Sequence, residues 1–91
     1  MSRDLRLIIF DVDGTLAETE ELHRRAFNET FAAHRLGWHW SQNDYRRLLR
    51  TTGGKERIAH HMRDLGLAPD RIDIPALHRA KTDRYVRLMG D

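Results

Sequence analysis

The stretch LIIFDVDGTLAET, residues 7–19, decides the fold, because an apolar run stops in it at two aspartates set one residue apart. The near-continuous apolar residues before Asp11 are typical of a strand that is covered on both faces of a parallel sheet. Open parallel sheets bind their ligands beyond the carboxyl ends of the strands, where Asp11 and Asp13 fall. Side chains alternate along an extended chain, so both carboxylates are expected on the same side of it.

Two neighbouring carboxylates repel each other, and the pair therefore needs either a proton or a hard cation such as Mg²⁺. Gly14 permits a tight turn or a close backbone approach, and Thr15 adds a hydroxyl and further N–H donors. The group suits a phosphate together with a magnesium ion. From the residues alone, the alternative is that the Asp-Gly pair only satisfies a turn at the end of the strand.

The chain after Thr19 is expected to be helical, because its apolar residues recur at helical spacing and no second strand-like run follows. Gly66 is the expected stop of the third helix. A parallel strand needs neighbours that these residues do not supply, so we expect the 91 residues to be the front part of a longer protein. Four helices are predicted, with starts near Glu20, Ser41, Lys55 and Pro75.

The composition narrows the class of protein. Hydrophobic residues make up 40% of the chain and charged residues 33%, as in globular proteins, and there is no cysteine for disulfides or thiolate metal sites. The apolar runs are far shorter than the ~20 residues of a membrane span, and the start lacks a signal-peptide pattern, so a cytoplasmic protein without a membrane partner is expected. A monomer is expected as well. A net charge of +2 and scattered arginine pairs favour solvated helix faces over a nucleic-acid surface.

The five residues DVDGT, numbers 11–15, follow an apolar strand and resemble the DxDGT signature of haloacid dehalogenase-type phosphohydrolases. The resemblance implies that Asp11 is the nucleophile that takes up a phosphoryl group. It implies that Asp13 is the general acid and base, and that both aspartates hold a Mg²⁺ ion. Relatives without the second aspartate, such as ion-pumping ATPases, keep the acyl-phosphate longer, so Asp13 favours hydrolysis or mutase chemistry.

The stretches FDVDGTLAETEELH and LLRTTGGKERI resemble the CbbY/β-phosphoglucomutase-like family most closely, whose members insert a four-helix cap after the first core strand. The implied fold is α/β. Residues 1–18 would form the first strand and catalytic loop of a Rossmannoid core, residues 19–88 a helical cap of the C1 type, and residues 89–91 the start of the return to the core. The core is incomplete here, because the family's Ser or Thr, core Lys and downstream acids cannot be placed, so the 91 residues alone are expected to be inactive.

The same resemblance implies that cap residues contact a phosphorylated sugar. Glu18 and His23 flank the hinge between core and cap, the loop RTTGGK offers N–H groups and two cations, and Lys81 is a cation among apolar residues. From the residues alone, Glu18 can instead be a helix N-terminal charge, His23 a half-buried helix histidine, and Lys81 a lysine whose head reaches water. The implied substrate-binding residues are Asp11, Glu18, His23, Arg50, Thr51, Thr52, Gly53, Gly54, Lys55 and Lys81.

The implied activity is Mg²⁺-dependent hydrolysis of a sugar phosphate or bisphosphate through an aspartyl-phosphate. In the most similar members the substrate is xylulose 1,5-bisphosphate, an inhibitor of carbon fixation in the Calvin cycle. One alternative is a sugar phosphomutase like β-phosphoglucomutase, in which a second sugar hydroxyl takes the place of water. A second alternative is a non-catalytic helical interaction module or a nucleic-acid-binding module, which the basic pI of 9.5 motivates.

Overall fold

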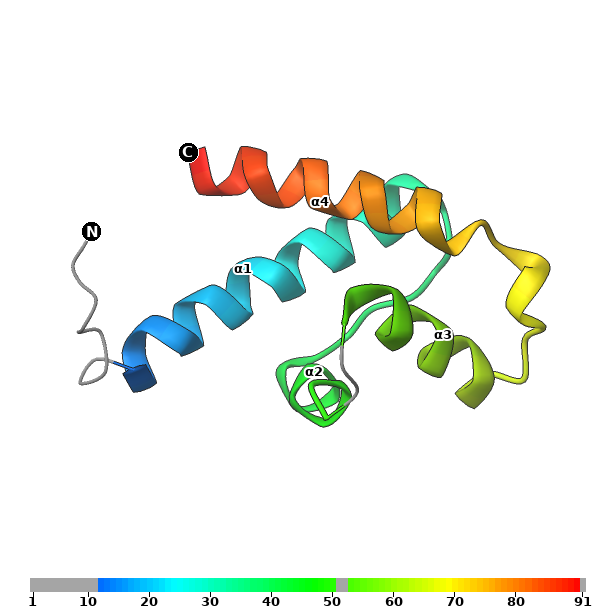
Figure 1. The fold of residues 1–91 in the computed structure, drawn as a ribbon, viewed down its shortest axis with the longest axis horizontal. Helices are drawn as coiled ribbons and strands as arrows, with labels where there is room; N and C mark the ends of the chain where they lie inside the picture. Colours follow the sequence, from blue (N-terminus) through cyan, green and yellow to red (C-terminus); the bar gives the residue numbers. More distant parts are fainter. Residues whose placement is uncertain (1–11, 51–52, 91) are drawn as a thin grey trace.

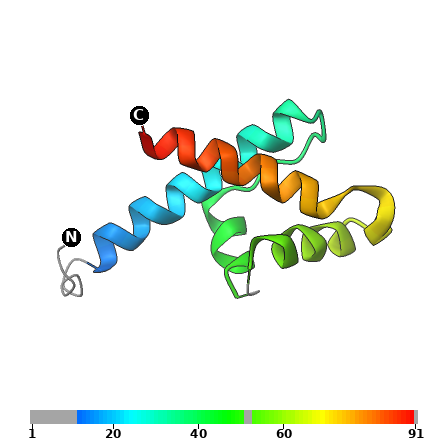
Figure 2. The ribbon, with the colours of Figure 1, turned by 45° about the horizontal axis from the view of Figure 1, so that its top comes forward.

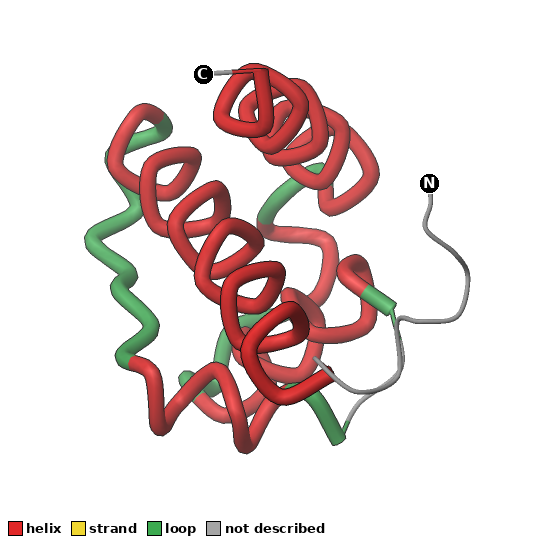
Figure 3. Tube along the Cα trace, turned by 90° about the vertical axis from the view of Figure 1, so that its left-hand side faces the viewer, coloured by secondary structure: helices red, strands yellow, loops and turns green. Residues whose placement is uncertain are grey.

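The computed structural model describes the backbone of residues 12–50 and 53–90, and the side chains of that part from Glu18 onward. Four α-helices and one 3-10 helix follow each other along the chain (Figure 1). In these described ranges every regular element is a helix (Figure 3). The elements are α1 (Val12–Ala33), α2 (Gln42–Leu48), α3 (Gly54–Asp64), η2 (Pro69–Arg71) and α4 (Ile74–Gly90).

The longest helices, α1 and α4, pack along each other and form one layer of the structure (Figures 1 and 2). The second layer consists of α2, which contacts α1, and α3, which contacts α4. The functional side chains described below project from α1, α4 and the start of α3. None of the described helices combines the length and apolar character that a membrane crossing requires.

The core lies where the two layers meet. Phe27 and Phe31 of α1 are 0% exposed, and each ring centroid lies 4.8 Å from that of Trp40. Ile58 and Met62 from α3 belong to the same cluster, with both side chains fully buried. The spacing of four residues within each pair places both members on one helix face, in agreement with the apolar residues expected at helical spacing.

The predicted capping box at the start of α2 is confirmed. Ser41 Oγ accepts from the Asp44 amide at 3.0 Å, and Asp44 Oδ2 accepts from the Ser41 amide at 3.2 Å. Two N–H groups that would otherwise lack partners at a helix start are thereby satisfied. The predicted start near Ser41 therefore follows from local chemistry.

The predicted glycine stop of α3 is confirmed as well. Gly66 has φ +74°, a conformation that costs glycine little. The Leu67 amide donates to the Met62 carbonyl at 2.8 Å, and the Gly66 amide donates to the Arg63 carbonyl at 3.0 Å. These two bonds form a Schellman motif, which satisfies carbonyls at the helix end.

The start of the first helix differs from the prediction. Helix α1 begins at Val12 and not near Glu20, so the backbone from Asp13 to Thr15 is helical and the predicted turn there is wrong for this structure. A helix makes its hydrogen bonds locally, whereas a loop at a sheet edge depends on partner strands, and the described residues form none. The predicted strand at residues 5–10 lies outside the described residues and stays a prediction.

Candidate functional site

The most unusual side chain of the described part is Lys81, which projects from α4 toward α1. It is a cation with only 5% of its surface exposed. Its Nζ lies 2.9 Å from His23 Nδ1. Among the described side chains, no carboxylate comes within ion-pair distance of this ammonium group. Buried charges are usually paired, so the counterion of Lys81 is expected to come from outside the described side chains.

Aromatic rings surround the ammonium group of Lys81. The Nζ atom lies 4.5 Å from the centroid of the Phe27 ring and 5.3 Å from that of Tyr85. The imidazole of His23 stacks on the Tyr85 ring, with centroids 4.0 Å apart and an interplanar angle of 3°. Cation–π attraction partly offsets the desolvation of a buried ammonium but does not neutralise its charge. The rings thus hold the cation in place while leaving its charge available.

The pKa values of this pair are shifted in a consistent sense. Burial, followed by the charge of Arg57, lowers the pKa of Lys81 to about 8. Burial, followed by the charge of Lys81, lowers the pKa of His23 to about 4. At neutral pH the lysine is therefore mostly charged and the histidine neutral, so the ammonium donates the hydrogen bond and Nδ1 accepts it.

The first turns of α3 lie near this pair, because Arg57 of α3 acts electrostatically on both His23 and Lys81. Gly53 precedes α3 with φ +84°, a conformation that side-chain-bearing residues rarely adopt. At Gly54 a Cβ atom would lie 2.4 Å from His78 Nε2 and 3.4 Å from Phe27 Cζ. Glycine at position 54 is thus required for the close approach of α3 to α4. Lys55 is exposed at the same helix start.

The remaining predicted site residues fall into two groups. Glu18 and Arg50 are exposed, and neither is joined to the pair of His23 and Lys81 by a contact among the described side chains. Four predictions rest on residues or side chains outside the described part: Asp11, the Asp13 side chain, Thr51 and Thr52. The described side chains contain no group of three His, Asp or Glu residues that could hold a metal ion, so the predicted aspartate pair carries the magnesium hypothesis alone.

Sequence reasoning missed three residues of this cluster. Tyr85, His78 and Arg57 were given no role in the site. A signal for His78 was present, because it stands three residues before Lys81 and thus on the same face of the helix. Arg57 lowers the pKa of both His23 and Lys81, a long-range effect that only the fold makes visible.

Comparison with known proteins identifies the family. The model of the haloacid dehalogenase-like hydrolases matches residues 5–89. The chain belongs to this family. Within it, the chain is 64% identical over 87 residues to protein CbbY of Rhodobacter capsulatus and 60% identical over 87 residues to protein CbbY of Cereibacter sphaeroides, covering 96% of this chain in each case.

A solved structure supports the same assignment to the haloacid dehalogenase-like hydrolases. It is that of an Asp→Asn variant of CbbY from Rhodobacter sphaeroides in complex with xylulose-(1,5)-bisphosphate. The match has a TM-score of 0.74 and 58% identity, and it covers 81% of this chain and 33% of that one. The chain spans 38% of the length of the two curated CbbY proteins, so it corresponds to only part of a member of this family.

Proposed function

We propose that the full-length protein containing this chain is a Mg²⁺-dependent phosphatase that hydrolyses a sugar bisphosphate, with xylulose 1,5-bisphosphate as its substrate. The observation that carries the proposal is the buried ammonium of Lys81, which is fixed by His23 and has no carboxylate counterion among the described side chains. A phosphate of the substrate would supply the missing anion. The CbbY structure with bound xylulose-(1,5)-bisphosphate, 58% identical to this chain, supports the choice of substrate.

The proposed reaction places the chemistry at the two aspartates of the DVDGT motif. A carboxylate oxygen of Asp11 attacks phosphorus, and the bond from phosphorus to the sugar oxygen breaks as Asp13 donates a proton to that oxygen. Water then attacks the phosphorus of the aspartyl-phosphate, Asp13 accepts the proton of that water, and Asp11 is released together with inorganic phosphate. Mg²⁺, held by carboxylate oxygens of Asp11 and Asp13, would offset the negative charge that accumulates around the phosphoryl group.

The helical residues 19–88 would act as a cap over this reaction. Closure would bring Lys81, together with Arg50 and Lys55, toward the substrate and exclude bulk water. Binding energy from the second phosphate can then position the first one for attack by Asp11. Glu18 at the hinge and the loop of residues 51–54 would complete the contacts, residues 1–18 would belong to the core, and residues 89–91 would begin the return to it.

Release of inorganic phosphate from xylulose 1,5-bisphosphate by the full-length protein tests this proposal. We expect turnover that requires Mg²⁺ and is abolished by Asp11→Asn. Formation of an isomeric sugar phosphate without free phosphate would instead indicate a phosphomutase, which uses the same two aspartates. A protein that neither releases phosphate nor isomerises phosphorylated sugars would contradict the catalytic proposal.

A further inference from the structure

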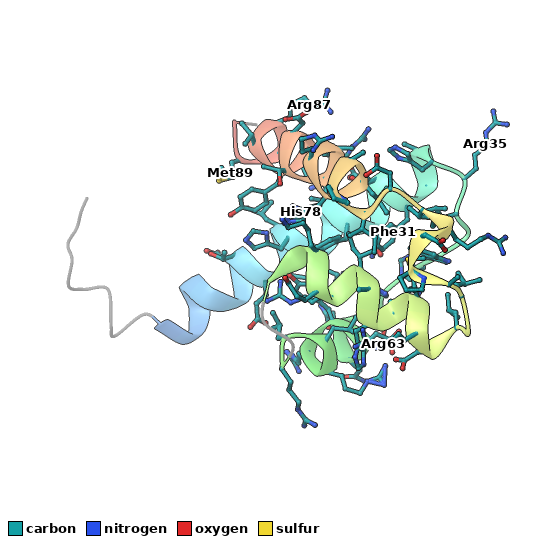
Figure 4. The ribbon with its side chains drawn as sticks, turned by 45° about the vertical axis from the view of Figure 1, so that its right-hand side comes forward. Phe31, Arg35, Arg63, His78, Arg87 and Met89 are labelled. Carbon is teal, nitrogen blue, oxygen red and sulfur yellow. The ribbon has the colours of Figure 1, made fainter. Side chains whose placement is uncertain are left out.

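His78 projects from α4 toward the first turn of α3 (Figure 4), and it interacts electrostatically with Lys81 and His23. The side chain is half-buried, and no hydrogen bond joins its ring to any other described residue. Its Nε2 and Cδ2 atoms lie so close to Gly54 that a Cβ atom there would stand 2.4 Å and 2.6 Å from them. The imidazole therefore lies against the Gly54 backbone, while the hydrogen-bonding capacity of its ring is unused within the described part.

The charges around His78 are mainly positive. Lys81 on α4 and Lys55 and Arg57 on α3 all disfavour its protonated form, as burial does, whereas Glu56 favours it. The net effect is a lowered pKa, with burial as the largest cause. His23 on α1 also faces this group. Near neutral pH, His78 is thus a neutral imidazole among cations, with one N–H donor and one nitrogen acceptor.

Neutral and charged groups in such a cluster suit different parts of one ligand. Ammonium and guanidinium groups favour phosphate oxygens, because their hydrogen bonds to anions are charge-assisted. A neutral imidazole is better matched to a hydroxyl, which can both donate and accept. A phosphorylated sugar carries both kinds of group within a few bonds of each other.

We infer that His78 is a further substrate-contacting residue whose imidazole hydrogen-bonds a hydroxyl of the phosphorylated sugar, and that Gly54 serves to seat this ring. The inference rests on the proposed function. Gly54 would then have two roles: its backbone can contact the substrate, and its lack of a side chain makes room for the His78 ring. His78 would also be a specificity-determining residue, since a ligand with phosphates and no hydroxyl gains nothing from it.

The test uses the full-length protein and steady-state hydrolysis of xylulose 1,5-bisphosphate. His78→Ala should raise KM about three- to tenfold, the equivalent of one neutral hydrogen bond, with kcat within about twofold. Gly54→Ala should raise KM similarly, since its methyl group displaces the ring, but should add little in the His78→Ala background. His39→Ala, which removes an exposed histidine elsewhere, should leave KM unchanged.

A second ligand separates hydroxyl recognition from a general effect on the fold. The inhibition constant of 1,5-pentanediol bisphosphate, which has both phosphates and no hydroxyl, should be the same in the wild type and in His78→Ala. If His78→Ala folds poorly, His78→Asn replaces it, because asparagine retains a donor and an acceptor. The KM of His78→Asn should lie between the wild-type value and the value expected when the contact is lost. An unchanged KM in both variants, or equal weakening of both ligands, would overturn the role of His78 and leave the proposed phosphatase intact. Absence of hydrolysis by the wild type would instead overturn the proposed function.

Discussion

Two stretches of the structure, both built around α1, differ sharply in what they bury. One is the aromatic core around Phe27, Phe31 and Trp40, where the rings pack edge to face or tilted. The other is the pair of His23 and Lys81, where a charged group is 5% exposed and has a neutral partner. The first stretch follows the rule that interiors are apolar and close-packed, and the second departs from it.

The aromatic core stabilises the fold, whereas the pair of His23 and Lys81 is explained by function. Apolar burial in the core contributes roughly 25 cal/mol per Å² of area removed from water, whereas an ammonium buried without a carboxylate costs free energy. A fold that retains such a cation must gain something else from it. Binding of an anionic substrate is the gain that the proposed function supplies, and the two stretches should therefore respond to mutation in opposite ways.

The largest expected effect on stability belongs to the core. Phe31→Ala removes a fully buried ring and leaves a cavity, so it should lower the free energy of unfolding by about 3–5 kcal/mol. Urea-induced unfolding of the full-length protein measures it. Leu65→Ala is the matched control, because Leu65 is 50% exposed, and it should change the free energy by less than about 0.5 kcal/mol. Equal effects at both positions would contradict the assignment of the core.

The second-largest effect is expected in the pH dependence of stability and of kcat/KM, which involves Lys81 and not the aromatic core. Because the pKa of Lys81 in the folded protein is about 8 and its ordinary value is 10.5, unfolding takes up a proton in that range, and this group makes the protein more stable as the pH rises from 8 to 10.5. Over the same range the lysine loses its charge, so kcat/KM for the bisphosphate should fall about tenfold per pH unit. Lys81→Arg, which stays charged, should abolish this decline. A profile that is the same in Lys81→Arg would disprove the role of the lysine charge.

A smaller effect is expected at the capping box of α2, which lies away from Lys81. Ser41→Ala removes the acceptor for the Asp44 amide and should destabilise the protein by about 1 kcal/mol, without a change in KM. Asn43→Ala, at an exposed position of the same helix, is the comparison variant. Thermal unfolding and steady-state kinetics of both variants check the result, and a rise in KM for Ser41→Ala alone would link α2 to the substrate.

The smallest effect concerns the end of α1. Arg35 has φ +57°, a left-handed conformation that is strained for a residue with a side chain, and it occupies the position where helices commonly carry glycine. Arg35→Gly should therefore stabilise the protein by roughly 0.5–1 kcal/mol. Arg63→Gly, in the last turn of α3 where the backbone is helical, should instead destabilise it by up to about 1 kcal/mol. The sign of the difference between the two melting temperatures decides the prediction.

The features that the sequence predicted well are those with local causes. The capping box at Ser41, the glycine stop at Gly66 and the buried face of α1 depend on residues no more than a few positions apart. The start of α1 was predicted wrongly because its cause is not local. Whether these residues form a helix or a loop at a sheet edge depends on the presence of partner strands. The signature at Asp11 identified the family, and the match over residues 5–89 confirmed it.

The site was predictable only in part, because its key contact is not local. His23 and Lys81 are 58 positions apart in the sequence. The family resemblance implied a role for each of them, but it did not link one to the other. That they touch, and that Tyr85 and Phe27 hold the ammonium group, follows only from the packing of α1 on α4. His78 was overlooked although it shares a helix face with Lys81, because its position beside Gly54 becomes visible only in the fold.

The central claim is that Lys81 is buried for the sake of an anionic substrate, and Lys81→Met tests it most directly. The change keeps the length of an unbranched side chain and removes the charge. We expect the unfolding midpoint of the full-length protein to stay the same or rise, because a buried charge is replaced by an apolar group. We expect KM for xylulose 1,5-bisphosphate to rise by about tenfold or more at neutral pH. A lower midpoint with an unchanged KM would show that the cation serves the fold and not the substrate, and would contradict this account.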